Sequence, residues 1–191
     1  MTGFTKCSKI VFVDRDGVIN YDPIGDYIKH WKDFEYLPGA IEGLKTVSKA
    51  GFQIIIISNQ AGIGDGIYTE ESLNDITAKM LKQLKKEKIN VGGVYYCLHG
   101  KQANCECRKP KTGLLKKAAV DHPFQPSETY FVGDKATDVE AGKSFGLRTI
   151  FVLTGHGALD RNKLKQNNPP EVVLPSLKEA ADYIVNQTHH D

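Results

Sequence analysis

The sequence predicts an α/β fold, a Rossmann-like parallel sheet with helices on both faces. Short apolar runs rich in β-branched residues alternate with segments of helical periodicity along the chain. The run Gln53–Ser58 contains four consecutive isoleucines, which is typical of a strand buried on both faces. Polar residues directly follow several of these runs. A repeated strand–helix order predicts parallel strands joined by right-handed crossovers.

Each expected strand is a short apolar run that ends at polar or turn-forming residues. In chain order the expected strands are Lys9–Val13, Gln53–Ser58, Val94–Tyr96, Thr129–Val132 and Arg148–Leu153. The expected helices are Pro38–Ala50, a helix from Thr69 to about Lys88, Leu114–Val120, Asp138–Phe145 and a last helix that begins at Ser176. The segment Gly155–Pro175 contains two adjacent prolines and two adjacent asparagines, so we expect a loop there.

Several residues mark the ends of the expected helices. Pro38 suits the first turn of its helix, where a missing N–H group costs nothing. Thr69 is an expected N-cap, and the two glutamates that follow it favour the positive end of the helix dipole. Ser176 and Glu179 have the spacing of a capping box.

Composition limits the class of protein. The chain has 191 residues, 40% of them hydrophobic, which is enough for one sizeable core, so we expect residues 1–191 to form a single domain. The formal charge of +2, from 25 basic and 23 acidic residues, gives no strong field for nucleic acid or a membrane. No apolar run approaches the roughly 18 residues that would span a bilayer. The N-terminal residues have no signal-peptide pattern, and we expect a cytoplasmic monomer.

Polar clusters follow three of the expected strands. Asp14 and Asp16 come after the first strand, Ser58 ends the second, and Asp134 comes after the fourth. Ligands gather at the carboxyl ends of parallel strands, so we expect these side chains to meet. Several carboxylate oxygens in one place suit Mg²⁺. The plainer interpretation, that each aspartate only caps a turn, fits any one of them better than the whole set together with Lys109.

This set of groups matches the needs of phosphoryl transfer. The reaction requires an in-line nucleophile, neutralisation of charge around the oxygens, and an acid for the leaving group. The Asp14 carboxylate could attack phosphorus and form an aspartyl-phosphate. Asp16, two residues further on, could protonate the leaving alkoxide and then activate water. Different environments would have to separate the pKa values of the two carboxyls.

Four motifs in order make the sequence resemble the haloacid dehalogenase (HAD) superfamily of phosphatases over essentially its whole length. The motifs are Val11–Val18, Ile57–Gln60, Arg108–Pro110 and Gly133–Asp138. The first pattern alone is common, whereas all four in order are highly specific.

The resemblance implies roles for individual residues. Asp14 would be the nucleophile and Asp16 the general acid/base. Ser58 and Lys109 would stabilise the phosphoryl group. Mg²⁺ would be bound by Asp14, Asp16 and Asp134.

A cysteine–histidine cluster predicts a second metal, Zn²⁺. Cys97, His99, Cys105 and Cys107 are four ligands within residues 97–107, the number that a closed tetrahedral structural site requires. Thiols stay reduced in the cytoplasm, which favours metal ligands or buried thiols over disulfides. The alternative is a set of buried thiols beside a surface histidine. The remaining cysteine, Cys7, is interpreted as an ordinary thiol.

The zinc loop before Cys-Arg-Lys-Pro narrows the resemblance to one subgroup. That subgroup contains D-glycero-D-manno-heptose 1,7-bisphosphate 7-phosphatases and histidinol-phosphate phosphatases. The short spacing between motifs leaves no room for a large cap domain. The segment Ser58–Ile63 is closer to the heptose enzymes, so we expect hydrolysis of the 7-phosphate of the heptose bisphosphate. Asp65 stands where those enzymes usually carry an arginine, and Ala136–Asp138 is closer to the alternative, histidinol-phosphate phosphatase.

The expected substrate is a small phosphorylated metabolite, and polar side chains near the motifs are candidates to bind it. The candidates are Arg15, Asp22, Asn59, Gln60, Arg108 and Lys135. A bisphosphate also needs cations away from the transferred group, and Lys111 is a further candidate for that contact.

Two alternatives come from other functional classes. The chain could be a non-catalytic module that binds a phospholigand, although every expected catalytic position is filled. A zinc-dependent nucleic-acid binder is disfavoured by the near-neutral charge.

Overall fold

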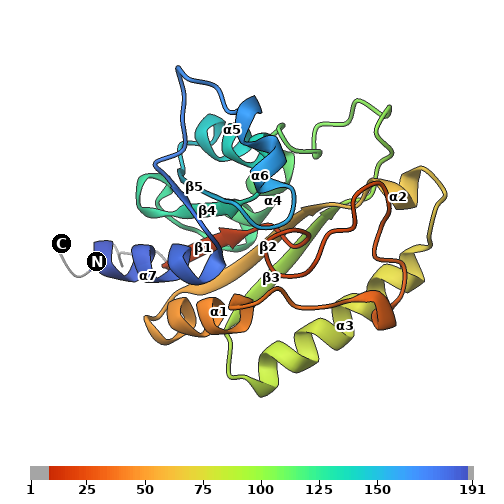
Figure 1. Ribbon diagram of the computed structural model, residues 1–191, viewed down its shortest axis with the longest axis horizontal. Coiled ribbons are helices and arrows are strands. Elements are labelled where there is room, and N and C mark those ends of the chain that lie inside the picture. The colour runs from red at the N-terminus through yellow and green to blue at the C-terminus, as the bar shows by residue number, and fades with distance from the viewer. Residues whose placement is uncertain (1–8, 189–191) are drawn as a thin grey trace, which may run out of the picture.

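A computed structural model describes residues 9–188. It contains a six-stranded, fully parallel sheet with the strand order β3-β2-β1-β4-β5-β6 (Figure 1). The strands are β1 Ile10–Val13, β2 Gln53–Asn59, β3 Val91–Cys97, β4 Tyr130–Gly133, β5 Arg148–Val152 and β6 Val172–Leu174. The α-helices are α1 Ala40–Lys49, α2 Ala61–Gly64, α3 Glu70–Lys86, α4 Gly113–Asp121, α5 Ala136–Ser144, α6 Gly157–Asp160 and α7 Leu177–Gln187. Short 3-10 helices are Trp31–Asp33, Pro126–Glu128 and Arg161–Lys163. The predicted fold class is confirmed.

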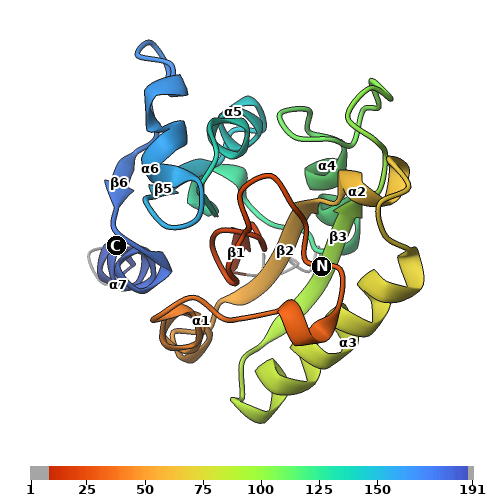
Figure 2. The same ribbon diagram turned by 45° about the vertical axis from the view of Figure 1, so that its right-hand side comes forward.

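Two hydrophobic layers cover the two faces of the sheet. One layer packs against α1, α3 and α7 and the other against α4 and α5 (Figure 2). The isoleucines of β2 alternate between the layers: Ile54 and Ile56 face the first, and Ile55 and Ile57 face the second. All four are fully buried. A run of isoleucines is stable here because neither face of this central strand meets water.

The expected helix signals are mostly confirmed. The Thr69 hydroxyl accepts the N–H of Ser72 at 3.2 Å and caps α3. The Ser176 hydroxyl caps α7 by accepting the N–H of Lys178 at 3.1 Å. Pro38 lies just before α1 and not in its first turn, because Gly39, at φ 77°, is the N-cap.

The segment expected to be a loop, Gly155–Pro175, contains helix α6 and strand β6. Strand β6 pairs in parallel with β5 and forms the edge of the sheet. Three apolar residues next to prolines give too short a signal to predict a strand. Strand β3 also begins three residues earlier than expected. The sequence does not predict this part of the strand, because Gly92 and Gly93 have low strand propensity. A Cβ atom at Gly92 would lie 2.2 Å from the Gln53 side chain, which packs over this glycine and would have to move to admit a larger residue.

Within residues 9–188, no helix combines the length and the apolar character needed to cross a bilayer.

Candidate active site

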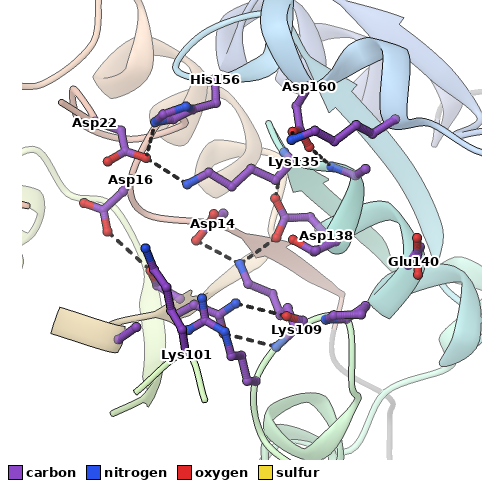
Figure 3. A pocket seen from close by; sticks show the side chains of 18 of the residues that line it. Asp14, Asp16, Asp22, Lys101, Lys109, Lys135, Asp138, Glu140, His156 and Asp160 are labelled. Carbon is purple, nitrogen blue, oxygen red and sulfur yellow. Dashed lines mark hydrogen bonds and ion pairs between the residues drawn. The ribbon is translucent and has the colours of Figure 1, made fainter. Parts of the chain in front are cut away.

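The carboxyl ends of the central strands deliver the predicted catalytic residues to one edge of the sheet. Asp14 follows β1, Ser58 lies near the end of β2, and Asp134 follows β4. Strand β1 lies between the other two, so these residues converge. Together with Asp16 and Lys109, Asp14 and Ser58 line an open pocket of about 800 Å³ (Figure 3).

The Lys109 ammonium is the centre of the charged cluster. Its Nζ lies 3.0 Å from Asp14 Oδ1 and 2.7 Å from Asp138 Oδ1, and it donates to the carbonyl of Ile57 at 2.9 Å. Burial alone would lower the pKa of Lys109, but Asp138 and Asp14 hold it above its ordinary value. This 3% exposed lysine therefore stays charged beside Asp14.

Asn59 fixes the backbone of Lys109. Its Nδ2 donates to the Lys109 carbonyl at 3.2 Å, and its Oδ1 accepts the Lys109 N–H at 3.1 Å. This pair of hydrogen bonds ties the loop that carries Lys109 to the end of β2. Asn59, a predicted substrate contact, is thus engaged with the protein backbone.

Three carboxylates form a buried group that could bind a cation. Oxygens of Asp14, Asp134 and Asp138 lie within 4.8 Å of one another. Asp134 Oδ2 accepts the N–H of His156 at 2.8 Å, whereas the buried Oδ1 has no hydrogen-bond partner among the described residues. Burial, together with the charges of Asp14 and Asp138, raises the pKa of Asp134 well above its ordinary value, although Lys135 acts to lower it. An unpartnered carboxylate oxygen within a hard oxygen donor set fits Mg²⁺.

Gly17 allows the first loop to approach Asp134. Its φ is +88°, and a Cβ atom there would lie 2.1 Å from Asp134 Oδ2. Glycine is therefore required both by the backbone conformation and by the space. The turn after Asp16 packs directly on the candidate cation site.

The three-carboxylate group differs in one member from the predicted magnesium ligands Asp14, Asp16 and Asp134. Asp138 joins Asp14 and Asp134, while the Asp16 side chain lies outside that group. Asp138 belongs to the fourth motif, but the sequence predicts no metal-binding role for it. Its position in the first turn of α5, four residues after Asp134, is the signal that could have identified it.

The Asp16 carboxylate lines the pocket and is held by side chains that lie behind the pocket lining. Arg15 binds it with Nε at 3.0 Å and Nη2 at 2.8 Å, Asn20 Nδ2 donates at 2.9 Å, and Gln60 Nε2 donates at 2.7 Å. Burial raises the pKa of Asp16, but Arg15 and these hydrogen bonds outweigh it and hold the pKa below its ordinary value. The Tyr68 hydroxyl donates to Gln60 Oε1 at 2.5 Å and so orients that amide. Asp16 is ionised in this arrangement, the form that can accept a proton.

Arg15 and Gln60, two further predicted substrate contacts, serve this arrangement. Arg15 is 1% exposed and donates to Gln60 Oε1 at 3.2 Å as well as to Asp16. Gln60 Nε2 also donates to the Ser58 hydroxyl at 2.9 Å. Neither Arg15 nor Gln60 lines the pocket. Both hold Asp16 from behind the pocket lining, and Gln60 also holds Ser58.

The opposite wall of the pocket contains the remaining predicted contacts. Lys135 Nζ lies 2.8 Å from Asp22 Oδ2, and His156 Nε2 lies 3.1 Å from the same oxygen (Figure 3). Burial is the largest effect on Asp22 and raises its pKa. Arg108 also lines the pocket, and its buried Nη1 has no hydrogen-bond partner in the described structure. An unpartnered guanidinium group at a pocket fits an anionic ligand.

The cysteine–histidine cluster assembles beside this pocket. The sulfur atoms of Cys97, Cys105 and Cys107 lie 3.1 to 3.5 Å from one another, and His99 Nδ1 lies 3.1 Å from Cys107 Sγ. Zn–S bonds of about 2.3 Å in a tetrahedron place sulfurs about 3.8 Å apart, so a small outward shift fits the ion. The donor set is that of a closed zinc site. Cys7 lies outside the described residues.

Comparisons with known proteins agree with this geometry. The profile of the HAD-hydrolase-like family matches residues 106–180. A D-glycero-beta-D-manno-heptose-1,7-bisphosphate 7-phosphatase from Helicobacter pylori strain J99 is 35% identical over 178 residues, which cover 93% of this chain and 97% of that protein. An enzyme of the same name from Pseudomonas putida is 36% identical and covers 87% of this chain and 92% of its own.

A solved structure shows the same fold. The D,D-heptose 1,7-bisphosphate phosphatase from B. bronchiseptica, complexed with magnesium and phosphate, superposes with a TM-score of 0.87 at 26% identity. The match covers 94% of this chain and 99% of that one.

Proposed function

The chain belongs to the HAD family of phosphatases, and from this premise we propose that it hydrolyses the 7-phosphate of D-glycero-D-manno-heptose 1,7-bisphosphate through an aspartyl-phosphate. The observation that supports this reaction best is the ion pair of Lys109 with Asp14 at the pocket. Asp134 lies beside this pair, and its buried Oδ1 has no hydrogen-bond partner among the described residues. The names of the relatives support the choice of substrate.

Asp14 is positioned to attack phosphorus. Both side-chain contacts of Asp14 among the described residues, the Arg15 N–H at 2.8 Å and Lys109 at 3.0 Å, are made by Oδ1. Oδ2 is left to form the new bond to phosphorus while the bond from phosphorus to the sugar oxygen breaks. Lys109 and the Ser58 hydroxyl would stabilise the phosphoryl oxygens as charge develops on them.

Asp16 would move the protons in both steps. It gives a proton to the leaving sugar oxygen and later takes one from the water that attacks the aspartyl-phosphate. The first step needs protonated Asp16, whereas Arg15 favours the ionised form. A phosphate dianion beside Asp16 would raise its pKa and favour the protonated form.

Both metals of this proposal have residues that fit them. Asp14 and Asp134 would hold Mg²⁺, with Asp138 or Asp16 completing the protein contribution, and the ion would neutralise the nucleophile and the phosphate. Cys97, His99, Cys105 and Cys107 would hold a structural Zn²⁺. The clustered free thiols also suit the reducing cytoplasm that we propose as the location.

The substrate would be bound mainly by Asp22, Arg108 and Lys135, which line the open pocket. No large cap is needed, because loops after the strands form the walls. We propose that residues 1–191 act as one domain, since both hydrophobic layers are built on the same sheet.

A phosphate-release assay tests this function. The heptose 1,7-bisphosphate and histidinol phosphate are compared by kcat/KM, each with and without Mg²⁺. We expect the bisphosphate to be the better substrate and activity to depend on Mg²⁺. Preference for histidinol phosphate would contradict the proposed substrate, and release from no substrate in the panel would favour the non-catalytic phospholigand module.

A further inference from the structure

Six lysine and arginine side chains line the pocket, and they differ in whether a carboxylate already pairs with them. They are Lys101, Arg108, Lys109, Lys111, Lys135 and Lys163. Four are paired: Lys109 with Asp14 and Asp138, Lys111 with Glu106, Lys135 with Asp22, and Lys163 with Asp160. Among the described residues, Lys101 and Arg108 alone in this set lack a carboxylate partner.

A substrate with two phosphate groups needs cations at two places. Arg108 directly precedes Lys109, which contacts the proposed nucleophile, and both residues line the pocket, so we assign Arg108 to the transferred phosphate. Lys101 is on another part of the loop, and its Nζ lies 6.0 Å from the centre of the Tyr27 ring. Figure 3 shows Lys101 among the side chains of the pocket. Lys101 is therefore a cation without a carboxylate partner on a segment of the pocket lining separate from Arg108.

The backbone around Lys101 is held against α2. The Lys101 N–H donates to Asp65 Oδ1 at 3.3 Å. A Cβ atom at Gly64 would lie 2.1 Å from the backbone nitrogen of Gly100, and one at Gly100 would lie 2.2 Å from Asp65 Oδ1. Gly64 therefore meets backbone and has no room for a side chain, whereas a side chain at Gly100 would displace the Asp65 carboxylate. The end of α2 thus sets the position of the loop at Lys101.

We propose that Lys101 binds the phosphate that is not transferred and so determines specificity for a bisphosphate, with Asp65 as the positioning residue for its loop. This proposal rests on the proposed function and names the residue that recognises the second phosphate. A lysine suits this role, because its ammonium is a point charge on a flexible stem that can reach a phosphate in an open pocket.

The paired lysines are less suited to the role. Lys111 donates to Asn104 Oδ1 at 3.0 Å in addition to its contact with Glu106. Lys135 is engaged by Asp22, which His156 also contacts. A phosphate would have to compete with a carboxylate at each of these lysines, whereas at Lys101 it would not.

Steady-state kinetics of Lys101→Met test the proposal with two substrates that share the transferred group. The substrates are the heptose 1,7-bisphosphate and heptose 7-phosphate. We expect KM for the bisphosphate to rise by about tenfold or more, the size of a lost charge-assisted hydrogen bond, with kcat nearly unchanged. The kinetics of heptose 7-phosphate should not change. Heptose 1-phosphate should inhibit the wild-type protein competitively and inhibit Lys101→Met much more weakly.

Three further variants make the test specific. Lys163→Met removes a lysine that lines the same pocket but is paired with Asp160, and it should leave both KM values unchanged. Lys101→Arg keeps the charge and should recover part of the lost affinity. Asp65→Ala removes the acceptor of the Lys101 N–H and should raise KM for the bisphosphate by a smaller factor than Lys101→Met.

The outcomes separate this proposal from the proposed function. Suppose that the wild-type protein hydrolyses the bisphosphate, and that Lys101→Met raises KM for the bisphosphate and for heptose 7-phosphate equally, or raises neither. Lys101 then does not recognise the second phosphate, while the proposed function stands. If KM for the bisphosphate rises selectively in Lys163→Met and not in Lys101→Met, the assignment to Lys101 is overturned. If the wild-type protein hydrolyses neither substrate, the proposed function itself fails.

Discussion

The catalytic cluster and the zinc loop hold their polar side chains in different ways. The catalytic cluster, defined as Asp14, Lys109, Asp134 and Asp138, is at most 3% exposed. Asp14 directly follows β1, Asp134 directly follows β4, and Asp138 lies in the first turn of α5. The zinc loop, residues 97–107, has only its first residue in a strand, and His99 is exposed.

From this difference we expect the two sites to depend to different degrees on the metals that we propose for them. The catalytic cluster is placed by the packing of the sheet, and Lys109 already compensates two of its carboxylates. The zinc loop has little buried apolar surface, so its ligands themselves must hold it in place. Metal binding is often the main source of stability for such a segment. We expect the catalytic cluster to persist without metal and the zinc loop to open.

The largest expected effect is on turnover, from Asp14→Asn. The amide cannot act as the nucleophile, and we expect kcat to fall by about 10⁴-fold or more, as for other nucleophile removals. The fold should be retained, because the amide is isosteric and still accepts from Arg15 and Lys109. Phosphate release gives the rate, and thermal denaturation checks the fold. Wild-type Mg²⁺-dependent turnover in this variant would falsify the assignment of the nucleophile.

The next effect is on stability, from Lys109→Met. Removal of one partner of a buried ion pair leaves charge uncompensated on Asp14 and Asp138, and we expect a loss of about 3–5 kcal/mol in the free energy of unfolding. Lys111→Met is the matched control, because Lys111 and Glu106 are 37% and 89% exposed. We expect that control to cost less than about 1 kcal/mol. Equal losses in urea denaturation would show that the catalytic cluster is not specially dependent on Lys109.

Loss of zinc should act locally. In Cys105→Ser, or after chelation, we expect rapid proteolysis within residues 97–107 and a loss of only about 1–2 kcal/mol in global stability. Cys7→Ser is the control, because Cys7 lies outside the cluster in the sequence and should leave one bound zinc per chain. Zinc content and peptide mapping measure the two effects. Unchanged proteolysis without zinc would mean that the loop is held by other contacts.

The smallest expected effect is on the free energy of unfolding, from the ion pair of Arg148 with Glu171 near the edge of the sheet. This pair serves as a reference for the two sites. Hydrogen bonds from Arg148 are the largest cause of the lowered pKa of Glu171. A carboxyl whose pKa is lowered on folding stabilises the protein above its unfolded pKa, about 4.3, and loses this contribution as pH falls through the folded value. We expect Glu171→Gln to cost about 0.5 kcal/mol at pH 7, since water screens the pair, and nothing well below pH 4. The free energies of unfolding of the wild-type protein and of Glu171→Gln are measured by urea denaturation at several pH values. A difference between them that does not change with pH would contradict the predicted pH dependence.

The residues that sequence could place are those that follow strands. Asp14, Ser58 and Asp134 were predictable because each ends an apolar run, and parallel strands bring such ends together. The cluster of Cys97, His99, Cys105 and Cys107 was predictable from spacing alone, and the structure brings the four side chains together. By contrast, Lys101 joins its site through contacts with distant segments, and no local pattern marks it. Asp138 is marked only by its place in the first turn of α5, four residues after Asp134.

Pairing between side chains explains why some residues predicted to contact the substrate contact other protein groups in the structure. Arg15 and Gln60 have the residue types of substrate ligands, but neighbouring polar groups bind them beneath the pocket. Which cations remain free depends on all the carboxylates nearby, and that requires the tertiary structure. Strand β6 was missed for a similar reason, since three residues form a strand there only because β5 offers an edge.

Trapping of the phosphoenzyme tests the central claim most directly. The protein is mixed with p-nitrophenyl phosphate, whose leaving group needs little protonation, and the reaction is quenched and reduced with borohydride before peptide mass spectrometry. We use Asp16→Asn to slow hydrolysis of the intermediate. We expect conversion of Asp14, and no other aspartate, to homoserine, with none in Asp14→Asn. Turnover with the modification on another residue, or without any modified residue, would contradict it.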